Sequence, residues 1–181
     1  MHEEMAQVKD RRFLKMIQQR AARVAVTASP ARGQGARGVV AAAREFMGEL
    51  PLARFGTANQ RDYSRHLDAA TRRLMASLPN GAATWGLSRK LLNIFLRDCL
   101  YTSYLALAYG LSAAERVMEI PLDSITAKAL RGQAPELPRW PGVKHLDPAR
   151  SAAYQAAALM LARERGLARV HLDAYWWGVR E

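Results

Sequence analysis

Two residues in this chain have the types and surroundings of a nucleophile and its partner: the amine of Lys90 and the carboxylate of Asp123. Lys90 follows a glycine, Gly86, at the expected start of an apolar helix, and Asp123 follows Pro121 at the expected start of another. An amine beside a carboxylate can attack an electrophilic carbon if the lysine pKa falls far enough for a neutral amine to form. Each residue also has a simpler interpretation, Lys90 as a solvated first-turn lysine and Asp123 as a helix cap.

The cysteine and histidine residues give no indication of a disulfide or a metal site. The single Cys99 excludes an internal disulfide and a four-cysteine metal site built from this chain alone. The four histidines are scattered, with no two at the spacing of metal ligands. We therefore expect no bound metal and no cofactor.

The charge balance points to a polyanionic partner. The 181 residues contain 27 Lys and Arg against 16 Asp and Glu, giving a net charge of +11 and an isoelectric point near 10.5. Nucleic acid is the first candidate partner, although a basic balance also occurs in arginine-rich proteins that bind no DNA. The N-terminus lacks the pattern of a signal peptide, and no apolar run is long enough to cross a bilayer. These features predict a soluble cytoplasmic protein, nucleoid-associated in a bacterium, with no membrane contact.

Apolar residues recur at three-residue and four-residue steps along almost the whole chain, which predicts an all-α fold. Asp123 and Asp147 precede two of the expected helices as caps, and Gly132 and Gly166 follow them as stops. Residues 1–38 are expected to form a helical segment and a connector, and residues 39–181 the main domain. The expected helices cover residues 3–26, 39–50, 59–78, 87–109, 113–118, 125–130, 148–165 and 171–179.

The connector contains a glycine motif, Gly33-Gln34-Gly35-Ala36-Arg37-Gly38, that matches the dinucleotide-binding fingerprint. A nucleotide-binding fold also needs strands alternating with helices, whereas the sequence that follows has helical periodicity. The motif is therefore interpreted as a flexible connector, and a dinucleotide-dependent enzyme remains a distant alternative.

The surroundings of Lys90 and Asp123 resemble one known family. The run from Trp85 to Asn93, Trp-Gly-Leu-Ser-Arg-Lys-Leu-Leu-Asn, resembles the hairpin of the helix-hairpin-helix DNA glycosylases, with Ser88 where common members carry a second glycine. Ile-Pro-Leu-Asp-Ser, ending at Ser124, resembles the element of that superfamily that contains its catalytic aspartate. The resemblance covers roughly residues 79–181.

Two further features are similar to the archaeal branch of this superfamily that is specialised for 8-oxoguanine. Lys90 and Asp123 are 33 residues apart, a longer separation than in the common bacterial enzymes. The segment Val-His-Leu-Asp-Ala-Tyr-Trp-Trp, ending at Trp177, resembles the aromatic end of that branch. The resemblance implies that Asp173 and Trp177 hold the extruded base, whereas core packing is the alternative for Trp176 and Trp177.

The family resemblance implies a helix-hairpin-helix glycosylase fold and a base-excision repair enzyme that acts as a monomer on double-stranded DNA with a flipped damaged base. Lys90 would attack the sugar with Asp123 as its partner, and a Schiff base would then allow strand cleavage by β-elimination without a redox cofactor. Gly86, Ser88 and Arg89 would contact the DNA phosphates. The alternative is a non-catalytic helix-hairpin-helix protein that binds DNA structure or damage.

Overall fold

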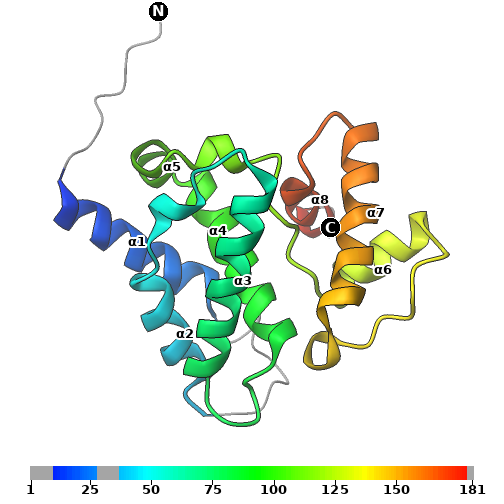
Figure 1. The fold of residues 1–181 in the computed structure, drawn as a ribbon, viewed down its shortest axis with the longest axis horizontal. Helices are drawn as coiled ribbons and strands as arrows, with labels where there is room; N and C mark the ends of the chain where they lie inside the picture. Colours follow the sequence, from blue (N-terminus) through cyan, green and yellow to red (C-terminus); the bar gives the residue numbers. More distant parts are fainter. Residues whose placement is uncertain (1–9, 28–36, 179–181) are drawn as a thin grey trace, which may run out of the picture.

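The computed structural model describes residues 10–27 and 37–178, and this part of the chain is helical with no β-strand (Figure 1). The expectation of an all-α protein is therefore confirmed for these residues. The α-helices are α1 (Arg11–Ala25), α2 (Val39–Gly48), α3 (Gln60–Ser77), α4 (Trp85–Tyr101), α5 (Ser103–Tyr109), α6 (Ser124–Gln133), α7 (Pro148–Glu164) and α8 (Leu172–Gly178). Four 3-10 helices join them: η1 (Leu52–Phe55), η2 (Leu111–Ala114), η3 (Val143–His145) and η4 (Arg169–His171).

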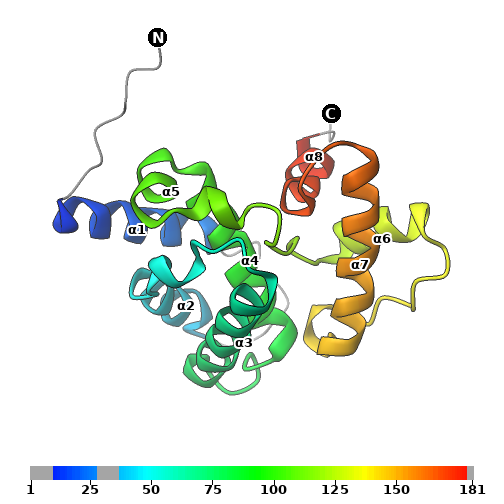
Figure 2. The same cartoon turned by 45° about the horizontal axis from the view of Figure 1, so that its top comes forward.

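The helices form two lobes, each with its own hydrophobic core (Figures 1 and 2). The first lobe contains α1 to α5, and its core runs from Leu14 to Met118 with the addition of Val170. The second lobe contains α6 to α8, and its core runs from Ile120 to Leu172. An extended linker, residues 118–123, joins the lobes. Helix α4 lies between them, because Leu92 packs in the first core while Trp85 packs against the second.

The boundary between the two cores does not coincide with the domain boundary expected at residue 38. Ala22 and Val26, in and just after α1, are buried in the same core as Val39 and Ala43 of α2. Residues 11–26 are thus part of the first lobe rather than a separate segment. The described residues change from one core to the other at the linker, so the structural division lies near residue 119.

A side-chain cap and a proline set the start of α7. Asp147 accepts a hydrogen bond from the Arg150 amide at 2.8 Å, and Pro148 occupies the first helical position. Such capping satisfies amides that lack a partner within the helix, and it stabilises a helix by about 1 kcal/mol. Gly166, with φ of 67°, follows the end of α7 in the left-handed conformation that glycine adopts without strain. These local features confirm the predicted cap and stop of α7.

The prediction of one continuous helix over residues 87–109 is wrong in one respect. The helix is broken at Thr102, whose backbone is extended with φ of −91° and ψ of 101°. The Thr102 hydroxyl donates to the Asp98 carbonyl at 2.8 Å, so this side chain offers the backbone a partner outside the helical pattern. Helix α5 therefore begins at Ser103. The helix expected at residues 113–118 is likewise replaced by the short η2 and a turn.

No helix in the described part of the chain is long and apolar enough to span a bilayer.

Candidate active site

Lys90 lies in the second turn of α4, and its amine is in electrostatic contact with two carboxylates of the second lobe. Burial lowers the pKa of Lys90 from its ordinary value of 10.5, because a charged ammonium loses its hydration between the lobes. Asp123 and Asp173 act in the opposite direction but do not cancel this effect. The environment of Lys90 thus favours the neutral amine more than water does.

Asp123 caps α6, as the sequence predicts. Its Oδ1 accepts hydrogen bonds from the Ile125 and Thr126 amides, each at 2.9 Å, which fixes the orientation of the carboxylate. The linker reaches this cap through Pro121 and Leu122, both of which are buried. The amides at the start of α6 and the buried linker residues thus hold the Asp123 carboxylate rigidly in place near Lys90.

Asp173, in the first turn of α8, is more buried than Lys90 and Asp123, with 4% of its surface exposed. It is ion-paired with Arg97, and its Oδ1 accepts a hydrogen bond from the Thr126 hydroxyl at 3.2 Å. Burial raises the pKa of Asp173 to about 6; Arg97 opposes this increase and the nearby Asp123 adds to it. Asp173 therefore changes protonation close to neutral pH.

The structure thus brings together three of the residues that the sequence singled out. Lys90 comes from α4, Asp123 from the linker and Asp173 from α8, and each pair of them interacts electrostatically. An amine of lowered pKa with two carboxylates around it has the groups required of a nucleophile, a proton acceptor and a stabiliser of positive charge.

Arg97 and Thr126 belong to the same site. From the sequence, Arg97 is expected only as a cation near Lys90 that could help to lower the lysine pKa, and Thr126 is not identified. Arg97 lies seven residues after Lys90, so both side chains project from one face of α4. Thr126 lies in the turn that Asp123 caps. Their spacing from Lys90 and Asp123 could have indicated them, although nothing in the sequence shows that both meet Asp173.

The structure places Gly86 differently from the hairpin expectation. Gly86 lies inside the first turn of α4, whose cap is Thr84, and it is buried beneath η3. A Cβ atom at this position would lie 2.1 Å from the Val143 carbonyl oxygen and 2.8 Å from Cβ of Leu146. The position therefore needs glycine for close packing against η3, and Gly86 does not form an exposed turn before Lys90.

Ser88 and Arg89 are also buried, which argues against contacts of their side chains with DNA. Ser88 is fully buried, and its hydroxyl has no hydrogen-bond partner among the described residues. Arg89 is 6% exposed and forms ion pairs with Asp68 and Glu119, each at 2.7 Å. The guanidinium is thus fully engaged within the protein.

The indole of Trp177 lies outside the described residues, so its expected place in a base pocket stays a prediction. The neighbouring Trp176 packs against the second core. It also lines a groove of about 720 Å³ between α6 and α8, together with Ile125 and Lys128.

Among the residues that the structure describes, no group of three or more His, Cys, Asp or Glu side chains is arranged to hold a metal ion. Comparison with known proteins gives no match, either to a family model, to a curated protein or to a solved structure.

Proposed function

We propose that this protein is a DNA base-excision glycosylase with β-elimination lyase activity, acting on oxidised guanine in duplex DNA. The observation that carries the proposal is the meeting of Lys90, Asp123 and Asp173 at the junction of the two lobes. The residues come from three separate segments, yet they are the three described residues to which the family resemblance gives reactive or base-binding roles.

In the proposed reaction the neutral amine of Lys90 attacks the sugar carbon C1′, and the damaged base leaves with the bonding electron pair. The ring oxygen then departs with a proton, which leaves an imine between Lys90 and C1′. Loss of a proton from C2′ and departure of the 3′ phosphate break the strand. The lowered pKa of Lys90 supports the first step, because only the unprotonated amine is nucleophilic.

Asp123 is suited to stabilise positive charge as the base leaves. Its carboxylate is fixed by the two amides at the start of α6, so it need not reorganise during the reaction. The net charge of +11 would supply non-specific attraction to the DNA phosphates. Because Gly86, Ser88 and Arg89 are buried, we expect exposed basic side chains to make those contacts.

The test is borohydride trapping on a duplex that contains 8-oxoguanine. Sodium borohydride reduces the imine to a stable amine, so the enzyme should become covalently attached to DNA, and peptide mass spectrometry should locate the attachment at Lys90. Lys90→Gln should form no adduct while retaining duplex binding. Absence of an adduct from the unmodified protein on oxidised, alkylated, deaminated and abasic duplexes would refute the lyase proposal.

Binding alone is the outcome that would favour a non-catalytic DNA-binding protein. In that case Lys90→Gln would only weaken affinity, and the slope of log K against log salt would fall by about 0.9 if one phosphate contact were lost.

A further inference from the structure

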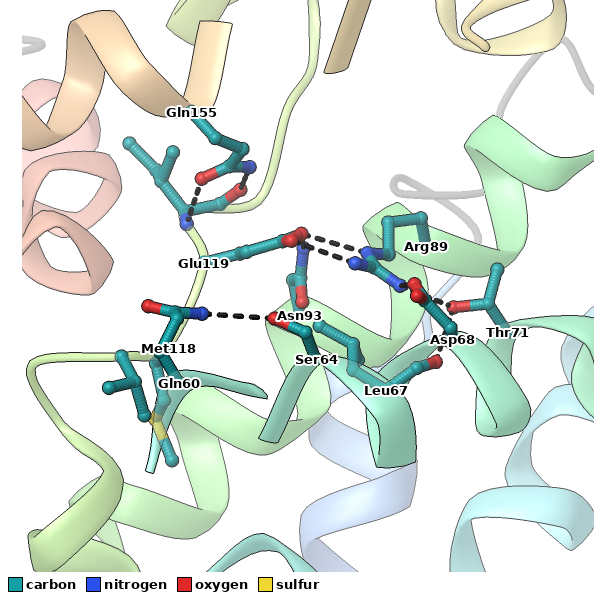
Figure 3. A network of polar contacts seen from close by, with 12 residues as sticks. Gln60, Ser64, Leu67, Asp68, Thr71, Arg89, Asn93, Met118, Glu119 and Gln155 are labelled. Carbon is teal, nitrogen blue, oxygen red and sulfur yellow. Dashed lines mark hydrogen bonds and ion pairs between the residues drawn. The ribbon is translucent and has the colours of Figure 1, made fainter. Parts of the chain in front are cut away.

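A second group of charged residues lies beside the site and takes no part in the proposed chemistry. Arg89, Glu119 and Arg169, which we name the buried charge triad, are all largely inaccessible to solvent. The Arg89 guanidinium donates to both carboxylate oxygens of Glu119, at 2.7 and 2.8 Å (Figure 3). Asn93 adds a third donor to this carboxylate at 3.1 Å. Burial opposes the charge on Glu119, but the hydrogen bonds and charge of Arg89 hold its pKa below the ordinary value.

Arg169 completes the triad by binding the backbone on which Glu119 lies. Its guanidinium donates to the Met118 carbonyl at 2.8 Å and to the Val117 carbonyl at 3.0 Å. Its positive charge also interacts with the Glu119 carboxylate. Gln155 of α7 holds the next residue through both Ile120 backbone groups, at 3.0 and 2.8 Å (Figure 3). Side chains from both lobes therefore hold the linker in place, rather than the backbone hydrogen bonds of a helix or a sheet.

Each member of the triad is close in sequence to one of the reactive residues. Arg89 immediately precedes Lys90 on α4. Glu119 lies four residues before Asp123, and Arg169 lies four residues before Asp173. The three segments that deliver the reactive residues are thus joined to one another at the triad.

The energetic character of such a triad suits it for positioning. Removing three charges from water carries a large desolvation cost, which their mutual attraction offsets only when the hydrogen-bond geometry is good. A hydrophobic cluster of equal volume often stabilises a protein as well or better, but it is less directional. The bidentate contact between Arg89 and Glu119 restricts how α4 and the linker can be oriented relative to each other.

We propose that the buried charge triad is a positioning device that fixes Lys90, Asp123 and Asp173 relative to one another across the two lobes. The proposal takes the reaction from the proposed function, but the placement of Lys90 can be measured without that reaction. Arg89, Glu119 and Arg169 act through their neighbours and touch no reacting atom.

The experiment compares Glu119→Gln with the double variant Arg89→Met/Glu119→Met. The first keeps the shape of the side chain but removes its charge, and the second replaces the ion pair by apolar side chains that the core tolerates. Glu49→Gln is the matched control, because Glu49 forms an exposed ion pair with Lys15 away from the site. Circular dichroism melting identifies the variants that are folded.

Two measurements report on position. The first is the pKa of Lys90, followed by NMR after ¹³C reductive methylation; the chain has five lysines, and Lys90→Gln identifies the signal by its loss. The second is the rate of borohydride trapping on 8-oxoguanine duplex. In folded triad variants the Lys90 pKa should rise by at least half a unit, because burial is the dominant influence on it. The trapping rate should fall at least tenfold, and Glu49→Gln should change neither quantity.

A folded double variant with unchanged Lys90 titration and an unchanged trapping rate would overturn the proposal and leave the triad a structural feature only. If both variants lose activity while the Lys90 pKa is unmoved or lower, positioning of Lys90 is also refuted. If the unmodified protein forms no adduct, the proposed function fails, and the Lys90 titration still decides the role of the triad.

Discussion

Replacing Gly86 by alanine tests whether this residue lies against η3, as in the structure, or in an exposed turn before Lys90. The added Cβ would lie 2.1 Å from the Val143 carbonyl oxygen, so the backbone of η3 would have to retreat by roughly 1 Å to reach a normal contact. Forcing extra atoms into a packed interface costs about 1–3 kcal/mol, and a clash with backbone belongs at the upper end of that range.

Helix propensity acts in the opposite direction and offsets part of this cost. Alanine is favoured over glycine inside a helix by about 0.5–1 kcal/mol. The net loss for Gly86→Ala is therefore about 2 kcal/mol, which lowers the melting temperature of a chain of this size by about 4–8 °C. Gly132→Ala is the matched control, since Gly132 lies in α6 and its Cβ would meet no atom within 4 Å. The control should melt about 1–3 °C higher than the unmodified protein.

Thermal unfolding by circular dichroism and DNA binding by fluorescence anisotropy separate the two interpretations of Gly86. Packing against η3 predicts that Gly86→Ala destabilises the protein. An exposed phosphate-binding turn predicts an unchanged melting temperature and weaker DNA binding. Equal melting temperatures for Gly86→Ala and Gly132→Ala would refute the buried position of Gly86.

Three further predictions concern Asp173, Asp123 and Cys99. The folded pKa of Asp173, about 6, exceeds its ordinary value of 3.8, so its contribution to stability, about 3 kcal/mol in all, is fully present only below about pH 4 and is lost as pH rises through about 6. Urea unfolding should show about 2 kcal/mol of this loss between pH 4.5 and pH 7.5, and Asp173→Asn should abolish it. Asp123→Asn should abolish borohydride trapping while changing the unfolding free energy by less than about 1 kcal/mol, because asparagine also caps helices; equal trapping by the variant would exclude a role for the charge. Burial raises the pKa of the Cys99 thiol well above its ordinary value, so this residue should react with a thiol reagent only as fast as the protein unfolds, and immediate labelling of the native protein would contradict its buried position.

Local chemistry explains which parts of the fold could be predicted from the sequence. The starts of α6 and α7 follow from Asp123 and Asp147, whose carboxylates satisfy amides only a few residues away. The end of α7 follows from Gly166 for the same reason. The core face of α3 follows from the period of its apolar residues. Each of these features depends on contacts within one or two turns of chain.

The features that could not be predicted depend on contacts between distant segments. Gly86 looks like a turn residue in the sequence, and only the position of η3 shows why a side chain is excluded there. Glu119 lies in a loop without periodicity, so nothing nearby indicates that Arg89, 30 residues earlier, neutralises it. Arg89 itself looked like an exposed phosphate-binding residue for the same reason. The role of a basic residue next to a predicted site is ambiguous in the sequence. The same arginine side chain can form a buried ion pair with a carboxylate or contact a phosphate at the surface.

Burial between the lobes shifts the pKa values of Lys90 and Asp173 toward each other. It lowers the pKa of Lys90 from 10.5 and raises that of Asp173 from 3.8 to about 6, so the two values approach each other. Moving a proton from the ammonium to this carboxylate costs about 1.4 kcal/mol for each unit that separates them. The shift of Asp173 alone reduces that cost by about 3 kcal/mol, and the shift of Lys90 reduces it further. The contact of the two lobes therefore lowers the cost of proton transfer from Lys90 to Asp173, which makes the relative placement of the lobes part of the proposed chemistry.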